Sequence, residues 1–83
     1  MNYTFISDPG HGWLAVPLAE IRALGIAGKI TPYSYQRREM AYLEEDRDAG
    51  TFLTAKKERG EEVSIKYEHQ EDTPIRQYAR FRA

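Results

Sequence analysis

Cysteine is absent from this sequence, and this excludes two common ways of stabilising a small protein. Neither disulfides nor thiolate-bound zinc can cross-link the fold. There is also no apolar run near the roughly 18–20 residues that cross a bilayer, and the N-terminus lacks the basic-then-apolar layout of a secretion signal. We therefore expect a cytoplasmic protein with no role in a membrane.

Motifs of known catalytic chemistry are also missing. The glycines around His11 do not have the spacing of a phosphate-binding loop. His11 and His69 are far apart in the chain and have no neighbouring ligands at metal-binding spacing. We therefore expect a protein that is not an enzyme and that binds no metal or cofactor. An enzyme would need His11 and a carboxylate to meet in a pocket.

Residues 10–13 (GHGW) form the most unusual local pattern, and two interpretations of it stay open. A histidine between glycines could act as a base or a ligand, with Trp13 as a stacking platform. The alternative is a tight turn whose tryptophan anchors a hairpin to the core. We favour the turn, because the sequence identifies neither a nucleophile nor an orienting group for His11.

The chain has 83 residues, of which 41% are hydrophobic, and is expected to form one α+β domain over residues 1–83 with a small core. Alternating apolar residues predict strands, and apolar residues three to four apart predict helices. The predicted order is ββαββαββ, an antiparallel sheet with two helices. The predicted strands cover residues 2–7, 13–16, 29–36, 40–44, 62–68 and 75–82, and the predicted helices cover 17–24 and 46–59. The strand over 29–36 is expected to be an edge or irregular strand, because Pro32 has no N–H to donate to a ladder.

Glycine and charge delimit the two predicted helices. Gly25 suits the left-handed position that follows a helix end, and Gly60 ends the second helix. Acids at the start of the second helix and basic residues at its end match the helix dipole.

The last two predicted strands alternate strictly, and we expect them to pair as a hairpin. Matching their apolar faces places Glu62 beside Arg82 and Glu68 beside Arg76 as cross-strand ion pairs. These pairs would neutralise most of the arginines of the last strand.

The formal net charge of −1 conceals an uneven distribution. Residues 1–38 carry a net +2, residues 39–72 carry −6, and residues 73–83 carry +3. An acidic centre between basic ends excludes a uniformly basic nucleic-acid-binding protein. It permits an acidic surface that meets a basic partner.

Acids crowd around the start of the second helix, and tyrosines are frequent. Helix N-termini favour acids, so capping and solvation explain part of the acidic cluster, but four acids exceed what a cap needs. A partner surface and acid–base chemistry are the other interpretations. Tyrosine suits interfaces, because its ring contacts apolar surface while its hydroxyl stays in water. The predicted partner-binding residues are Glu44, Glu45, Asp46, Asp48, Tyr33 and Tyr35.

Several motifs together resemble small proteins carried by bacterial phages and prophages. These motifs are Asp8-Pro9-Gly10-His11-Gly12-Trp13, Leu24-Gly25-Ile26, Tyr33-Ser34-Tyr35, Tyr42-Leu43-Glu44-Glu45-Asp46 with Asp48-Ala49, and Pro74-Ile75-Arg76 with Tyr78-Ala79. The resemblance spans most of the chain and implies a bacterial host and an anti-CRISPR or other anti-defence role. A shorter stretch resembles the swapped-hairpin (AbrB-like) transcription factors, through Val16-Pro17 and Leu24-Gly25-Ile26.

The leading hypothesis is a non-enzymatic phage-type inhibitor in the cytoplasm of a bacterial host. It would bind a host protein or ribonucleoprotein complex, concretely a CRISPR surveillance complex, and its acidic surface would block nucleic-acid binding as a DNA mimic. Direct nucleic-acid binding is the alternative, by a small regulator that uses Arg37, Arg38, Arg76, Arg80 and Arg82. Either protein would be a monomer or a homodimer.

Overall fold

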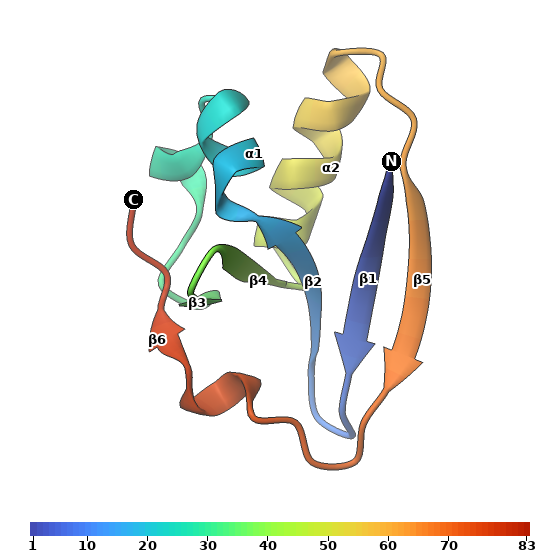
Figure 1. Cartoon of the computed structure of the whole chain (residues 1–83), viewed down its shortest axis with the longest axis vertical. Helices are drawn as coiled ribbons and strands as arrows, with labels where there is room; N and C mark the ends of the chain where they lie inside the picture. Colours follow the sequence, from blue (N-terminus) through green and yellow to red (C-terminus); the bar gives the residue numbers. More distant parts are fainter.

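The computed structural model describes all 83 residues and contains a six-stranded sheet with two α-helices on one face (Figure 1). The predicted α+β class is confirmed. In chain order the elements are β1 (Asn2–Ser7), β2 (Gly12–Pro17), α1 (Leu18–Ala23), β3 (Tyr35–Arg37), β4 (Met40–Glu44), α2 (Asp48–Glu58), β5 (Ser64–His69) and β6 (Ala79–Arg80), with short 3-10 helices at Ala27–Lys29 and Ile75–Gln77. No helix combines the length and apolar character needed to cross a membrane.

The first hairpin is confirmed and has a defined turn. The Asp8 carboxylate accepts hydrogen bonds from the backbone N–H groups of Gly10 and His11, at 2.9 and 2.8 Å. Such a side-chain-to-backbone turn is typical of aspartate. At Gly12 an added Cβ would overlap the ring of Phe5, so this position admits no side chain without a shift.

The core lies between the helices and one face of the sheet. Leu14 and Leu43 face each other across β2 and β4 and are fully buried. Ile21 of α1 and Phe52 of α2 pack into the same cluster. Because side chains alternate along a strand, Trp13 lies on the opposite face, where it anchors a second, smaller cluster with Tyr35 and Ile75. Trp13 is thus buried, as the anchor interpretation predicts, but in this second cluster and not in the main core.

The predicted strand over residues 29–36 is mostly wrong. Only Tyr35–Arg37 forms a strand there, after a 3-10 helix and an irregular segment around Pro32. A proline has no N–H to donate to a ladder, so a strand cannot continue normally through this position. The helices are close to prediction, and positive φ angles at Gly25 and Gly60 follow their ends.

The predicted final hairpin is wrong. The sheet order is β5-β1-β2-β4-β3-β6, so the last two strands lie at opposite edges. β5 pairs in parallel with β1, and β6 pairs with β3. Alternation shows that a strand has two different faces, but it does not identify the neighbouring strand. The ion pairs expected for Glu62 and Glu68 with the last strand therefore do not form.

A buried cation holds one end of the molecule together. Lys56 is almost completely buried, and its Nζ lies 2.8 Å from Glu20 of α1 and 2.9 Å from Glu61. The Tyr3 hydroxyl donates to the same Glu20 carboxylate. Burial alone would lower the pKa of Lys56, but these hydrogen bonds outweigh it and raise that pKa above its ordinary value. The network joins β1, α1 and α2 through charged groups.

Glu20 should make the protein sensitive to acid. Burial favours a higher pKa, but hydrogen bonds from Lys56 and Tyr3 hold the pKa of Glu20 below its ordinary 4.5. A lowered pKa stabilises the fold above pH 4.5, and that contribution is lost as the pH falls through the folded-state value. We predict that Glu20→Gln flattens the fall in unfolding free energy, measured by urea denaturation from about pH 7 to about pH 3. The exposed acid Glu58, changed to Gln, is the control; if both variants follow the wild-type curve, Glu20 has no such role.

Candidate functional site

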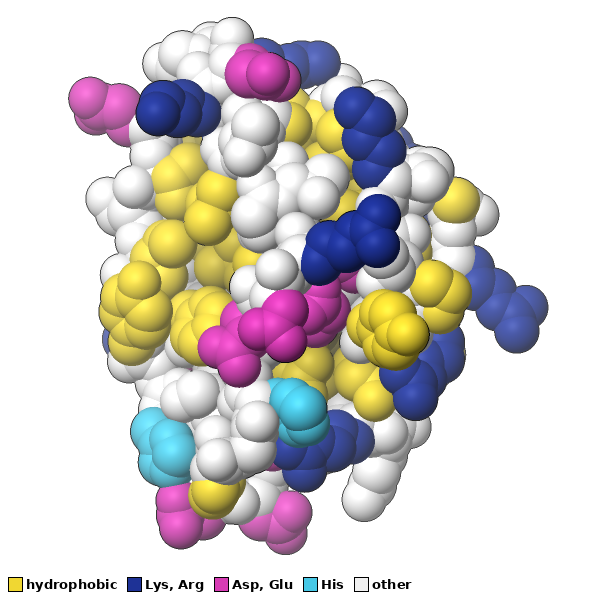
Figure 2. Space-filling view, turned by 180° about the vertical axis from the view of Figure 1, so that it is seen from behind, with side chains coloured by type: hydrophobic (Ala, Val, Ile, Leu, Met, Phe, Trp, Pro, Cys, Tyr) yellow, Lys and Arg dark blue, Asp and Glu magenta, His cyan; other side chains and the backbone are white.

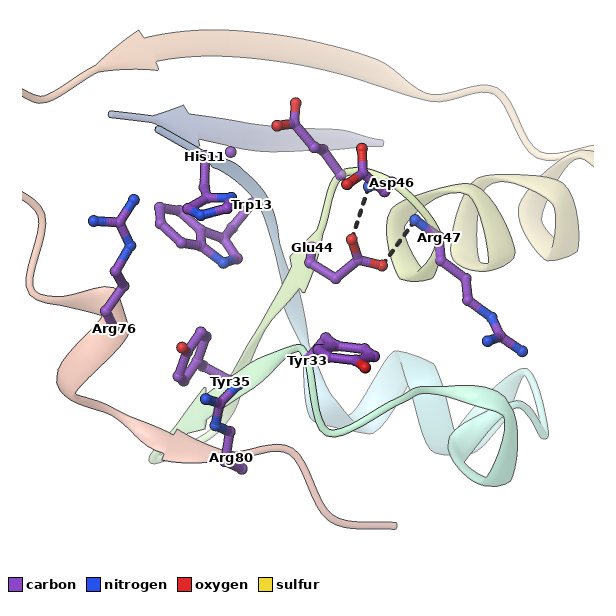
Figure 3. A pocket seen from close by; sticks show the side chains of 11 residues that line it. His11, Trp13, Tyr33, Tyr35, Glu44, Asp46, Arg47, Arg76 and Arg80 are labelled. Carbon is purple, nitrogen blue, oxygen red and sulfur yellow. Dashed lines mark hydrogen bonds between the residues drawn. The ribbon is translucent and has the colours of Figure 1, made fainter. Parts of the chain in front are cut away.

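A cleft of about 500 Å³ opens beside the strand ends, and its walls come from five separate segments of the chain (Figure 3). Three aromatic rings, three carboxylates and three guanidinium groups line it, together with a histidine and a glycine. The lining residues are His11, Gly12, Trp13, Tyr33, Tyr35, Glu44, Glu45, Asp46, Arg47, Arg76 and Arg80.

Aromatic rings form the centre of the cleft. Trp13 is 2% exposed, and its ring centroid lies 6.4 Å from that of Tyr35 in an edge-to-face arrangement. The His11 ring lies 6.1 Å from the Trp13 ring. Tyr33 is 71% exposed. Of the three rings, only that of Tyr33 is largely exposed to a ligand, because Trp13 and Tyr35 are 2% and 9% exposed and form the floor on which it stands.

Glu44 is occupied by its own chain. Its Oε1 accepts hydrogen bonds from the backbone N–H groups of Arg47 and Asp48, each at 2.7 Å, and its Oε2 accepts from Asp46 N–H at 2.8 Å. Arg47 is the N-cap residue and Asp48 the first residue of α2, so the Oε1 of Glu44 caps N–H groups that a helix start leaves unpaired. The neighbouring Glu45 is exposed like Asp46, and neither makes a salt bridge.

Asp48 cannot belong to a partner surface, and its inclusion among the partner-binding residues was wrong. It is 0% exposed. Its Oδ2 accepts from the backbone N–H and hydroxyl of Thr31, at 3.0 and 2.6 Å, and from the hydroxyl of Ser34 at 2.6 Å. Its Oδ1 is buried without a partner. The side chain points inward because α2 begins at this residue, directly above the loop that carries Thr31 and Ser34.

Two arginines form the wall opposite the carboxylates. The Arg76 guanidinium lies 5.5 Å from the Trp13 ring centre, and that of Arg80 lies 4.9 Å from the Tyr35 ring centre. Figure 3 shows both arginines on the side of the cleft away from Asp46. The predicted strand over 75–82, which would carry Arg76, Arg80 and Arg82, is mostly wrong: Arg76 lies in a 3-10 helix, and of the three only Arg80 lies in β6. The cleft is dipolar: three carboxylates and Arg47 line one wall, and Arg76 and Arg80 line the other.

Arg76 is held in place by the first turn. Its guanidinium is 2.9 Å from Asp8 Oδ1, the atom that also accepts from Gly10 and His11. Burial alone would raise the pKa of Asp8, but these backbone donors and Arg76 outweigh it and keep the pKa below its ordinary value. The turn therefore stays negatively charged at neutral pH and fixes the arginine over Trp13.

The sequence predicted most of one wall and missed the other. Five of the six predicted partner-binding residues line the cleft; these are Tyr33, Tyr35, Glu44, Glu45 and Asp46. Arg76 and Arg80 were assigned to a neutralised strand face, and their place beside the carboxylates was missed. Four of the short motifs singled out in the sequence, from different parts of the chain, contribute residues to this cleft.

A second polar cluster lies outside the cleft and was also missed. Ser7 Oγ is 3.1 Å from His69 Nδ1, and His69 Nε2 is 2.5 Å from Glu71. The order hydroxyl, imidazole and carboxylate is that of an activated nucleophile, and the parallel pairing of β1 and β5 creates it. However, the His69 and Glu71 side chains are 53% and 81% exposed, and an ion pair so exposed to water stabilises little. We do not assign a function to it.

Known proteins offer no guide to either cluster. Comparison with protein families, with curated proteins and with solved structures finds no match. No group of three or more His, Asp or Glu side chains is close enough to hold a metal ion. The functional argument therefore depends on the cleft itself.

Removing the Asp48 carboxylate should destabilise the protein. In Asp48→Ala the buried hydroxyl of Ser34 and the partly buried donors of Thr31 lose their acceptor, which costs about 1–3 kcal/mol of unfolding free energy. Asp46→Ala, two residues earlier and exposed, should stay within about 0.5 kcal/mol of wild type. Chemical denaturation measures both. Equal effects of the two changes would contradict the structural role of Asp48.

Proposed function

We propose that this protein is a non-catalytic, phage-type inhibitor that binds a bacterial host complex through the cleft. The observation that carries the proposal is the convergence of separate motifs on one place. The segments around Trp13, Tyr33, Glu45 and Arg76, which are far apart in the chain, all contribute to the same cleft. Their resemblance to phage proteins supports a role against a host defence system, concretely a CRISPR surveillance complex.

The composition of the cleft favours a protein partner. Tryptophan, tyrosine and arginine are the residues that most often dominate protein–protein binding energy, and six of the eleven lining residues are of these types. In the space-filling view from behind, acidic side chains form a band near the middle of the face, with hydrophobic side chains on both sides (Figure 2). Phosphate backbones would meet repulsion from Glu45 and Asp46, which makes direct nucleic-acid binding the less favoured alternative.

The recognised group on the partner is a cationic side chain. Glu45 and Asp46 present carboxylates without internal ion pairs, and Tyr33 presents an exposed ring beside them. A lysine or arginine of the partner would gain both an ion pair and a cation–π contact there. CRISPR effector complexes hold nucleic acid in a positively charged channel. An inhibitor that occupies basic side chains of such a channel blocks nucleic-acid binding with only two free carboxylates, assisted by aromatic contacts.

Reversing the two free acids should abolish inhibition and leave the fold intact. We predict that wild-type protein binds a purified CRISPR surveillance complex and prevents it from binding its DNA target. The double variant Glu45→Lys/Asp46→Lys should bind at least about tenfold more weakly, because two attractive contacts become repulsive. Biolayer interferometry measures the binding, and a gel shift with target DNA measures the inhibition.

A matched charge reversal elsewhere serves as the control. Glu58→Lys/Glu62→Lys makes the same change of net charge at exposed acids outside the cleft and should bind like wild type. If the cleft variant binds as tightly as this control, the cleft is not the site. If wild-type protein binds no surveillance complex but shifts bare DNA or RNA at low salt, the nucleic-acid alternative replaces the proposal.

A further inference from the structure

β5 is a long and unprotected edge of the sheet. It is the outermost strand in the order β5-β1-β2-β4-β3-β6, and Figure 1 shows no backbone segment beyond it. Five of its six residues are exposed, and Tyr67 is 72% exposed despite its large ring. The opposite edge, β6, has only two residues. One edge alone therefore has the length to bind another strand.

The hydrogen bonds to β1 determine which groups of β5 are free. The N–H of Ser64 donates to the carbonyl of Met1, and that of Gln70 donates to the carbonyl of Ser7, both at 2.8 Å. In a parallel pair, every second residue of a strand directs its backbone N–H and C=O groups to the neighbouring strand. The residues between them direct these groups to the opposite edge, away from that strand. Ile65, Tyr67 and His69 therefore direct N–H and C=O groups away from the sheet. Unpaired backbone groups of this kind are a template for strand addition.

We propose that this edge binds β5 of a second copy of the chain, antiparallel, about a two-fold axis at Tyr67. The charges select this register. Centring the axis on Lys66 would oppose two lysines, and centring it on Glu68 would oppose two glutamates, which destabilises a strand pair. Centring it on Tyr67 places Lys66 opposite Glu68 of the second copy, and by symmetry this pair forms twice. Axes further towards either end of β5 leave a shorter overlap.

The same register also covers the exposed aromatic surface. Within one chain the Tyr67 ring packs beside Phe5, with centroids 5.7 Å apart. Directly opposed residues of antiparallel strands project to the same face, so the two Tyr67 rings would meet, each with a Phe5 behind it. A lysine on an edge strand can instead serve to prevent association. Lys66 Nζ lies 3.8 Å from Glu68 Oε2 of its own chain, and both side chains are exposed. In this register the two lysines and two glutamates of a pair of copies would alternate in one cluster, which makes the edge complementary to itself.

Single charge reversals should separate the two copies, and their mixture should restore the pair. In a Lys66→Glu dimer, the new glutamate of each copy would face Glu68 of the other, and in a Glu68→Lys dimer two lysines would face each other in the same way. The dissociation constant of each variant dimer should therefore be at least about tenfold higher than that of wild type. In an equimolar mixture of the two variants, each glutamate of one chain would again face a lysine of the other. The mixture should therefore form a heterodimer. Analytical ultracentrifugation of the full chain measures these states, and circular dichroism checks that each variant is folded.

Cysteine cross-linking tests the position of the axis, because the chain contains no cysteine of its own. A hydrogen-bonded antiparallel pair has its Cα atoms about 5.5 Å apart, which a disulfide can span. Tyr67→Cys should therefore form a disulfide-linked dimer under mild oxidation. His69→Cys is the control, because its symmetry mate would lie four residues away, at about 13 Å.

Two results would overturn the proposal. One is that the wild-type chain sediments as a monomer at every concentration up to about 1 mM. The dissociation constant of any dimer would then exceed about 1 mM, too weak for a specific pair. The other is equal cross-linking of the Tyr67→Cys and His69→Cys variants, which would mean that the contact is random. The proposal does not depend on the function of the cleft.

Discussion

The cleft depends on one buried carboxylate, that of Asp48. It binds the hydroxyl of Ser34, which in turn accepts the N–H of Glu44 at 3.0 Å. The carbonyl of Ser34 accepts the N–H of Phe81 at 2.9 Å and so holds the C-terminal strand. Ser34 is 0% exposed, and through it the loop, β4, α2 and β6 meet at one point. A buried carboxylate is stable here because three donors converge on one of its oxygens.

This anchor divides the acidic cluster by function. Asp48 and Glu44 are used internally, the first to fix the loop and the second to cap the helix. Only Glu45 and Asp46 remain free to meet a partner. An extended acidic surface that imitates DNA would need more free carboxylates than this. We therefore propose recognition of basic side chains by a compact cleft, with contact area from Tyr33 and with Glu45 and Asp46 as the charged groups.

The local structure could be predicted from the sequence, and the arrangement of the strands could not. Strand bounds at 2–7 and 40–44 agree with the structure because alternation and turn residues are local signals. The partners of β5 and β6 depend on which surfaces bury the most apolar area, and neither strand encodes this choice by itself. The contact between Ser7 and His69 was missed for the same reason.

The candidate site was partly predictable. Tyrosines and acids in short motifs indicated a surface, and five of those residues do line the cleft. The burial of Asp48 was not predictable, because an acid in a first helical turn is normally expected in water. Nor was the position of Arg76, since its partner Asp8 lies at the other end of the chain and only the folded molecule brings them together.

The central claim is that the cleft contacts the host partner, and two tyrosines of nearly equal exposure test it directly. Tyr33 borders the cleft and is 71% exposed, while Tyr67 lies on the β5 edge and is 72% exposed. A photo-crosslinking phenylalanine analogue is placed at one position or the other, the labelled protein is irradiated with the surveillance complex, and the adducts are identified by mass spectrometry. The account predicts adducts with a subunit of the complex from position 33, and adducts with a second copy of the chain from position 67. Host adducts from position 67 and none from position 33 would contradict it.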